Sequence, residues 1–311
     1  MDLLIQKVLS SMIRRYRRPL MVIGFVVLLI LGVIGSQLPS IGAGLILHPF
    51  HRRFVASPPF MCRTVTLQGE GVTLQGWRGE GLGNRRGTLI YLHGVADNRA
   101  SGAGVIERFR KRGFDVLAYD SRAHGDSGGD ACTYGPLEKQ DLRRVLDTVR
   151  PGPIVLVGSS LGAAVALQLA ADEPRVSAVV AAESFSDLRT VVTERAPFFF
   201  TSGIIEQSIH LAEQQGHFQI DAANPALAAK TIKAPVLLIH GAVDVDTRPD
   251  HTRRIFSALA GPKRLILVPG AGHNQSLQGD VWSEIERWID SVIIVPPEVL
   301  GLGNEPDRPS N

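Results

Sequence analysis

The 311-residue sequence is poor in cysteine and in aromatic residues. Its two cysteines are Cys62 and Cys132, and no Cys-x-x-Cys or Cys/His spacing of a zinc site occurs. We therefore expect no metal ion. An oxidising compartment would permit a disulfide between the two cysteines, but two unpaired thiols are the preferred expectation.

Neither sign of charge dominates the chain, whose formal net charge is +3. Residues 1–19 carry five basic side chains and one acidic one, which leaves 28 basic and 29 acidic side chains in the remainder. The basic character thus belongs to the N-terminus. The rest has no excess of positive charge of the kind that binds nucleic acid, so no nucleic-acid partner is expected.

Residues 20–38 form one long hydrophobic run, interrupted only by Ser36 and Gln37. A helix of this length spans roughly 28 Å, close to the thickness of a bilayer core. The arginines of residues 14–18 place the N-terminus in the cytoplasm and the remainder on the extracytoplasmic, periplasmic side. A cleaved signal peptide is the alternative. We favour a retained anchor, because the apolar region is long and no Ala-x-Ala follows it.

Downstream, apolar runs of strand length alternate with helical patterns, which predicts an α/β fold around a mostly parallel sheet. The expected divisions are a basic segment 1–19, an anchor 20–38, a linker 39–63, a globular domain 64–295 with a helical insert 186–234, and a disordered tail 296–311. The predicted strands are 64–67 and 72–77, paired as a hairpin, then 88–92, 114–119, 154–157, 176–182, 236–239 and 264–268. The predicted helices are 105–112, 137–149, 163–171, 251–259 and 281–292.

The most informative motif is the Gly-x-Ser-x-Gly of residues 158–162, placed between a buried apolar strand and a helix rich in small residues. A serine on such a tight turn has a strained backbone and an exposed hydroxyl, and the flanking glycines give the turn room. The amide of Leu161 lies at the helix N-terminus, where it can donate to an oxyanion.

Polar residues follow three further predicted strands. His93 and Gly94 end one strand, Asp244 comes just after a second, and His273 just after a third. Ligands of such sheets bind beyond the carboxyl ends of the strands. A serine needs a base to attack a carbonyl, and the base needs an acid to orient it. The chain order Ser, Asp, His is that of α/β-hydrolases.

With these motifs, residues 64–292 resemble the α/β-hydrolase superfamily. The resemblance rests on residues 91–94, 120–127, 158–162, 240–244 and 272–273. Within the superfamily, the chain is similar to membrane-anchored hydrolases related to serine aminopeptidases and prolyl oligopeptidases, which have one N-terminal span and a small lid. The resemblance implies helices on both faces of the sheet and makes the insert 186–234 the lid.

The resemblance assigns Ser160 as nucleophile, Asp244 as acid and His273 as base, with the backbone amides of Val95 and Leu161 as the oxyanion hole. Three alternatives remain at this point. They are Ser159 as nucleophile, Asp246 as acid and, one strand earlier, Asp187 as acid. The other histidines are expected to have structural or solvated roles.

The expected activity is hydrolysis of a carboxylic ester or thioester through an acyl-enzyme, with no cofactor and a small-molecule or lipid-like acyl substrate. The short insert ranks this above a peptidase-like activity. Two alternative functions remain: an acyltransferase that uses the same residues, and an inactive membrane-tethered scaffold. The phenylalanines of residues 198–200 could line an acyl pocket, dip into lipid or form the core of the lid. The oligomeric state is not readable from the sequence.

Overall fold

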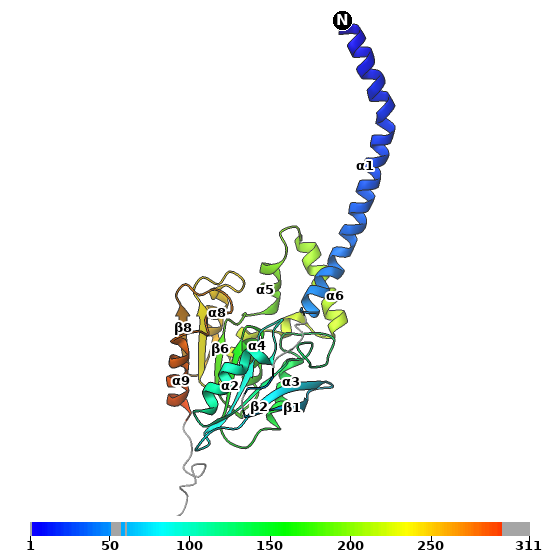
Figure 1. Cartoon of the computed structure of the whole chain (residues 1–311). Helices are drawn as coiled ribbons and strands as arrows, with labels where there is room; N and C mark the ends of the chain where they lie inside the picture. Colours follow the sequence, from blue (N-terminus) through cyan, green and yellow to red (C-terminus); the bar gives the residue numbers. More distant parts are fainter. Residues whose placement is uncertain (1, 51–56, 60, 294–311) are drawn as a thin grey trace, which may run out of the picture.

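The structure is a computed structural model that describes residues 2–50, 57–59 and 61–293. A globular domain carries one long helix, α1 (Asp2–Leu47), which extends far beyond the domain surface (Figure 1). The expected tail 296–311 and residues 51–56 of the expected linker lie outside the described residues.

The domain is built on one eight-stranded sheet in the order β1-β2-β4-β3-β5-β6-β7-β8. The hairpin β1–β2 is antiparallel, β2 pairs antiparallel with β4, and every later pair is parallel. The predicted α/β-hydrolase fold class is therefore confirmed. The strands are β1 (Cys62–Gln68), β2 (Thr73–Gly79), β3 (Gly87–Leu92), β4 (Phe114–Tyr119), β5 (Ile154–Ser159), β6 (Val176–Ala182), β7 (Val236–Gly241) and β8 (Lys263–Val268).

Helices cover both faces of this sheet, and each face has its own hydrophobic core. The helices are η1 (Arg99–Gly102), α2 (Ala103–Arg110), α3 (Glu138–Leu146), α4 (Leu161–Ala170), α5 (Leu188–Arg195), α6 (Ser202–Gly216), η2 (Ile220–Ala222), α7 (Pro225–Ala229), α8 (Pro249–Ala258) and α9 (Val281–Val292). One core contains α3, α4, α7 and α8, and the other contains α2 and α9. Strands β3, β4 and β5 are buried at every residue, as expected of central strands covered on both faces.

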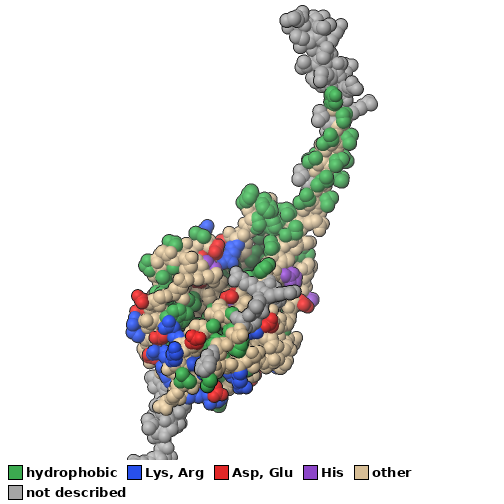
Figure 2. Space-filling view, in the orientation of Figure 1, with side chains coloured by type: hydrophobic (Ala, Val, Ile, Leu, Met, Phe, Trp, Pro, Cys, Tyr) green, Lys and Arg blue, Asp and Glu red, His purple; other side chains and the backbone are tan. Residues whose placement is uncertain are grey.

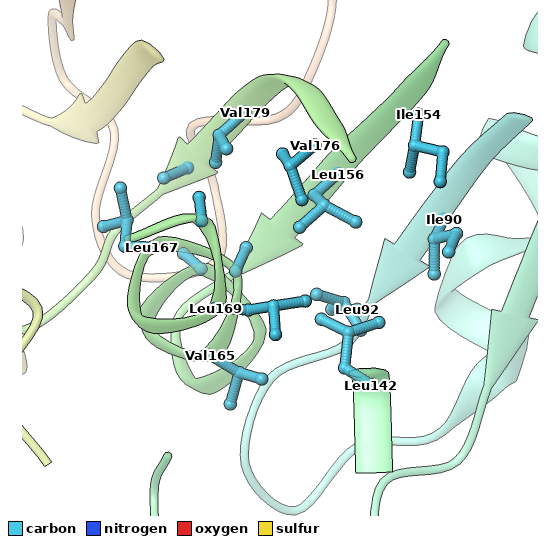
Figure 3. Close-up of a cluster of buried hydrophobic side chains, with 14 of the residues drawn as sticks. Ile90, Leu92, Leu142, Ile154, Leu156, Val165, Leu167, Leu169, Val176 and Val179 are labelled. Atoms are coloured by element: carbon cyan, nitrogen blue, oxygen red, sulfur yellow. The ribbon is translucent and has the colours of Figure 1, made fainter. Parts of the chain in front are cut away.

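Helix α4 is apolar around its whole circumference apart from Gln168, and all its residues are buried. Such a helix is stable only inside a core. Leu167 and Leu169 lie in the same buried cluster as Leu156 and Val179 of the sheet (Figure 3). This packing fixes the N-terminus of α4 at the end of β5.

The two cysteines lie in different cores. Cys132 is buried on the α4 face, whereas Cys62 packs against the core on the α2 face. The sheet separates the two side chains, so the alternative of a disulfide between them is excluded. Burial raises the pKa of the Cys132 thiol well above its usual value.

Helix α1 is longer than the predicted anchor. It continues through residues 39–47, where we expected a linker, although Pro39 lies inside it. Its last turns pack on α6, and Ala43, Ile46 and Leu47 share a buried cluster with the insert residues Ile209 and Ala212. The backbone oxygen of Leu47 also accepts a hydrogen bond from the amide of Cys132 (2.8 Å). Tertiary packing therefore maintains a helix that Pro39, Gly42 and Gly44 disfavour.

The insert 186–234 is helical, but its parts pack differently. Helix α6 lies beside the end of α1 (Figure 1), and α5 contributes to the buried cluster that these two helices share. Helix α7 packs against α4 and α8, and Ala229 and Ile232 belong to the main core. The projecting part of the insert is thus α5 and α6, which we call the lid.

Candidate active site

Ser160 occupies a sharp turn between β5 and α4. Its φ of 49° and ψ of −109° are strained for a residue with a side chain. A Cβ on Gly162 would lie 2.1 Å from the carbonyl oxygen of Leu92, and one on Gly158 would lie 2.4 Å from the carbonyl carbon of Gly162. Glycine is therefore required on both sides of Ser160. The Ser160 amide donates to the oxygen of Ala182 (2.8 Å), which holds the turn against β6.

The structure brings Ser160, His273 and Asp244 into one hydrogen-bonded row. His273 Nε2 lies 3.1 Å from Ser160 Oγ, and His273 Nδ1 lies 2.7 Å from Asp244 Oδ2. The three residues follow β5, β8 and β7, so the carboxyl edge of the sheet places them together. The imidazole is thus positioned to take a proton from the hydroxyl while the carboxylate orients the ring.

The Asp244 carboxylate is fully buried and has several donors. Its Oδ1 accepts the amides of Asp246 and Thr247, both at 2.9 Å, and its Oδ2 lies 3.2 Å from His240 Nε2. Burial opposes ionisation, but hydrogen bonds from His240, His273 and Thr247 outweigh it and hold the pKa of Asp244 well below its usual value. Asp244 is therefore ionised near neutral pH.

The alternative residues are placed elsewhere. Asp246 is exposed and only its backbone contacts Asp244. Asp187 caps α5, where its Oδ1 accepts the amide of Thr190 at 2.8 Å. Ser159 is the last residue of β5, and the hydroxyl that lies within hydrogen-bond distance of His273 Nε2 is that of Ser160.

The expected oxyanion-hole residues flank Ser160. Leu161 is the first residue of α4, so its amide has no acceptor within the helix. The Gly94–Val95 turn approaches from β3, and a Cβ on Gly94 would lie 3.6 Å from that of Ser160. The buried ring of His93 holds this turn: Nδ1 bonds to the Gly94 oxygen (2.7 Å), and Nε2 accepts the amide of Ser121 (2.9 Å). Burial lowers the pKa of His93, and both contacts suit its neutral form.

A cavity of about 420 Å³ adjoins this turn on the α2 and α9 side. Its walls include Val95, Ser159, Glu183 and Asn274, and its lining is mainly polar. Open space therefore lies beside the Ser160 turn.

Sequence reasoning missed Glu183, a buried carboxylate at the end of β6. Its backbone has a positive φ of 57°, and its oxygens accept the amides of Asn274 (2.6 Å) and Ser276 (3.0 Å). Its Oε2 also lies 4.0 Å from His273 Nδ1. The signal in the sequence is a polar residue directly after a strand, four residues before the alternative acid Asp187.

Sequence reasoning also missed Arg195, which connects the lid to the loop of Asp244. Its Nε donates to the oxygen of Asp246 (2.7 Å), and its terminal nitrogen donates to Thr247 Oγ1 (2.5 Å). The amide of Thr247 in turn donates to Asp244, so two successive hydrogen bonds link Arg195 of α5 to Asp244.

The remaining histidines that the structure describes in the domain have structural or exposed positions. His240 bonds to Thr252 Oγ1 (2.6 Å) and to the oxygen of Thr247 (2.7 Å), and His124 bonds to the oxygen of Arg122 (2.8 Å). His251 is buried between Ser186 and Glu194, and His210 and His217 are exposed. Among the side chains that the structure describes, no three of His, Cys, Asp or Glu gather to hold a metal ion.

Comparison with known proteins agrees with the fold. A family model described as alpha/beta hydrolase fold matches residues 87–202, and that of the prolyl oligopeptidase family matches residues 145–293. These two matches support a protein of the hydrolase class. The chain has the α/β-hydrolase fold, and the two matches are consistent with an α/β-hydrolase of the prolyl-oligopeptidase-like type.

Solved structures resemble the domain over most of its length. The esterase Pf2001 of Pyrococcus furiosus superposes with a TM-score of 0.65 at 25% identity, covering 79% of this chain and 100% of that one. An acylaminoacyl peptidase of Pyrococcus horikoshii superposes with a TM-score of 0.61 at 14% identity, covering 75% of this chain and 41% of the peptidase chain. The second likeness shows the fold alone.

Two curated relatives are similar in sequence. YfhR of Escherichia coli is 29% identical over 230 residues, which are 69% of this chain and 75% of YfhR. Rv2307c of Mycobacterium tuberculosis is 28% identical over 234 residues, which are 73% and 78%. Both relatives carry the description of uncharacterised proteins, so they add no substrate.

Proposed function

We propose that this protein is a serine hydrolase that cleaves a carboxylic ester or thioester through an acyl-enzyme on Ser160. The observation that carries the proposal is the hydrogen-bonded row from Ser160 Oγ through His273 to Asp244. The match to hydrolase families and the likeness to an esterase support it.

The reaction proceeds in two halves. His273 Nε2 takes the hydroxyl proton as Ser160 Oγ attacks the carbonyl carbon, and the amides of Val95 and Leu161 donate to the resulting oxyanion. His273 then protonates the departing alcohol or thiol, which leaves the acyl group on Ser160. Water, deprotonated by His273, attacks this ester, and the carboxylic acid leaves as the serine regains its proton.

A peptidase-like activity is the second candidate, because the prolyl oligopeptidase family matches residues 145–293. Acyl transfer to an alcohol would use the same three residues, with the alcohol in place of water. The inactive scaffold is the remaining alternative. The substrate that we propose is a small-molecule or lipid-like acyl compound, and no nucleic acid takes part.

We further propose that the protein is anchored in a membrane through α1. The stretch Met21–Leu47 is long and apolar enough to cross a bilayer. The positive-inside rule, applied to the arginines before it, favours an N-terminus in the cytoplasm and a domain on the periplasmic side. Reporter proteins fused after residue 293 test this orientation. A fused alkaline phosphatase should be active and a fused cytoplasmic reporter should be inactive. The opposite pattern would overturn the orientation.

The enzymatic proposal is tested with the full chain in detergent. Wild type should hydrolyse p-nitrophenyl esters and acyl thioesters faster than aminoacyl anilides, and Ser160→Ala should lose roughly 10⁶-fold in kcat. Ser159→Ala is the matched control and should retain turnover. Faster cleavage of the anilides would favour the peptidase, and alkyl ester products in added alcohol would reveal acyl transfer. A wild type without turnover in any assay would favour the scaffold.

A further inference from the structure

The segment between α5 and α6 exposes aromatic side chains. In this lid tip, Pro197–Phe200, the side chain of Phe198 is 100% exposed and that of Phe199 is 54% exposed. The three phenylalanine rings contact one another edge to face, with centroids 5.4 Å apart along the row. Exposed aromatic clusters of this kind mark surfaces that meet another apolar phase.

The lid tip lies against α1. Phe200 turns inward, and its Cε2 lies 3.0 Å from the position that a Cβ on Gly42 would occupy. An apolar cavity of about 190 Å³ separates the two elements elsewhere, between Leu45 and Ile46 of α1 and Pro197 and Phe200 of the tip. The hydrophobic side chains of the lid and of α1 form neighbouring areas in Figure 2. The surface of the tip is thus continuous with that of the candidate membrane span.

The length of α1 sets the depth of the tip. Exposed apolar residues extend along α1 from Met21 to Leu45. Helical rise makes that distance about 36 Å, whereas the hydrocarbon core of a bilayer is about 30 Å thick. The apolar part of α1 is thus roughly 6 Å longer than the hydrocarbon core is thick, and this extra length lies at the level of Gly42 and the lid tip. The tip is therefore at the membrane interface, where aromatic side chains commonly enter a bilayer.

The domain end of α1 is fixed to the domain. His48 Nδ1 bonds to the oxygen of Asp130 (2.6 Å), the oxygen of Leu47 bonds to Cys132, and Gly42 lies too close to Ser208 for any side chain. A membrane that holds α1 must therefore also meet the lid.

We propose that the lid tip inserts into the leaflet that α1 enters, so that the domain rests on the membrane surface with its lid facing lipid. The occupant of this surface is the bilayer, because the tip continues the apolar face of α1. The proposal depends on α1 crossing a membrane and is independent of the enzymatic activity.

The experiment is tryptophan fluorescence of the full chain in phosphatidylcholine vesicles, with and without bromine on the acyl chains. Phe198→Trp places a reporter on the tip, and Ile30→Trp places one on the exposed face of α1. Leu82→Trp is the control, because Leu82 is 53% exposed in the β2–β3 loop, away from the lid. Wild-type emission from Trp77, Trp282 and Trp288 is subtracted.

We expect the bromolipids to quench Phe198→Trp and Ile30→Trp, and to leave Leu82→Trp unchanged. Phe198→Trp should also emit at shorter wavelength in vesicles than Leu82→Trp. Quenching of Ile30→Trp alone overturns the insertion of the lid: long-wavelength emission from Phe198→Trp would then show water around the tip, and short-wavelength emission a second copy of the chain. Absence of quenching in both variants overturns the membrane span as well.

Discussion

The carboxylate of Glu183 holds the loop that carries His273. One oxygen accepts the amide of Asn274, the other accepts that of Ser276, and the nearer oxygen lies 4.0 Å from His273 Nδ1. A second buried acid therefore supports the imidazole, although Asp244 makes the direct hydrogen bond.

Glu183→Gln should lower kcat about tenfold and leave KM unchanged, because a displaced imidazole impairs proton transfer rather than substrate binding. The amide keeps one acceptor but turns its NH₂ group towards a backbone N–H, which should lower the free energy of unfolding by about 1–3 kcal/mol. Steady-state kinetics and urea unfolding measure the two effects. Wild-type kcat with reduced stability would limit Glu183 to a purely structural role.

Arg195→Met should lower kcat/KM about tenfold, because the change removes both hydrogen bonds that steady the loop of Asp244. Arg189→Met on the same helix is the control: Arg189 pairs with the exposed Glu206 and Asp221, and surface pairs contribute about 0–1 kcal/mol. Ester hydrolysis by both variants tests the comparison. Equal losses would mean that any change in α5 disturbs the site.

Gly162→Ala should destabilise the protein by about 3 kcal/mol or more, because the new methyl group would overlap the backbone oxygen of Leu92. Gly104→Ala in α2 is the matched control. No atom lies within 4 Å of its new Cβ, so the helix should gain about 0.5–1 kcal/mol. Thermal unfolding monitored by circular dichroism compares the two. A stable Gly162→Ala protein would contradict the close packing of α4 on β3.

Stability should fall as the pH drops below about 6.5, the ordinary pKa of histidine in the unfolded chain. Burial lowers the pKa of His93 and of His251 in the folded protein, so below that pH only the unfolded state takes up their protons. Each histidine lowers the free energy of unfolding by about 1.4 kcal/mol per pH unit, until the pH reaches the pKa of that histidine in the folded protein. Above pH 6.5 both states are neutral and the contribution is constant.

Urea unfolding between pH 7.5 and 5 measures this slope. His93→Gln should reduce it, whereas His210→Gln should leave it unchanged, because His210 is exposed. An unchanged slope in His93→Gln would mean that the folded protein also protonates this ring.

The sequence allowed the fold to be predicted because each central strand is a continuous apolar run that ends in a polar or glycine-rich turn. The same regularity placed Ser160, Asp244 and His273 at one edge of the sheet, and the structure brings their side chains together.

Contacts between distant segments could not be predicted in the same way. Glu183 meets a loop that is 91 residues away along the chain, and no local pattern encodes that meeting. Helix α1 continues past Pro39 because α6 packs on it, which overrides a segment of low helix propensity. The sequence of the lid tip allowed three roles for its phenylalanines. The structure shows that Phe200 faces α1, whereas Phe198 is exposed.

The proposed hydrolysis requires that Ser160 is an activated nucleophile. Labelling of the full chain with a fluorophosphonate, followed by mass spectrometry of the modified peptide, tests this requirement for wild type, Ser160→Ala and Ser159→Ala. We predict a phosphonylated Ser160 in wild type and in Ser159→Ala, and no label in Ser160→Ala. Labelling that persists in Ser160→Ala, or a folded wild type that takes up no label, would show that Ser160 is not the activated nucleophile.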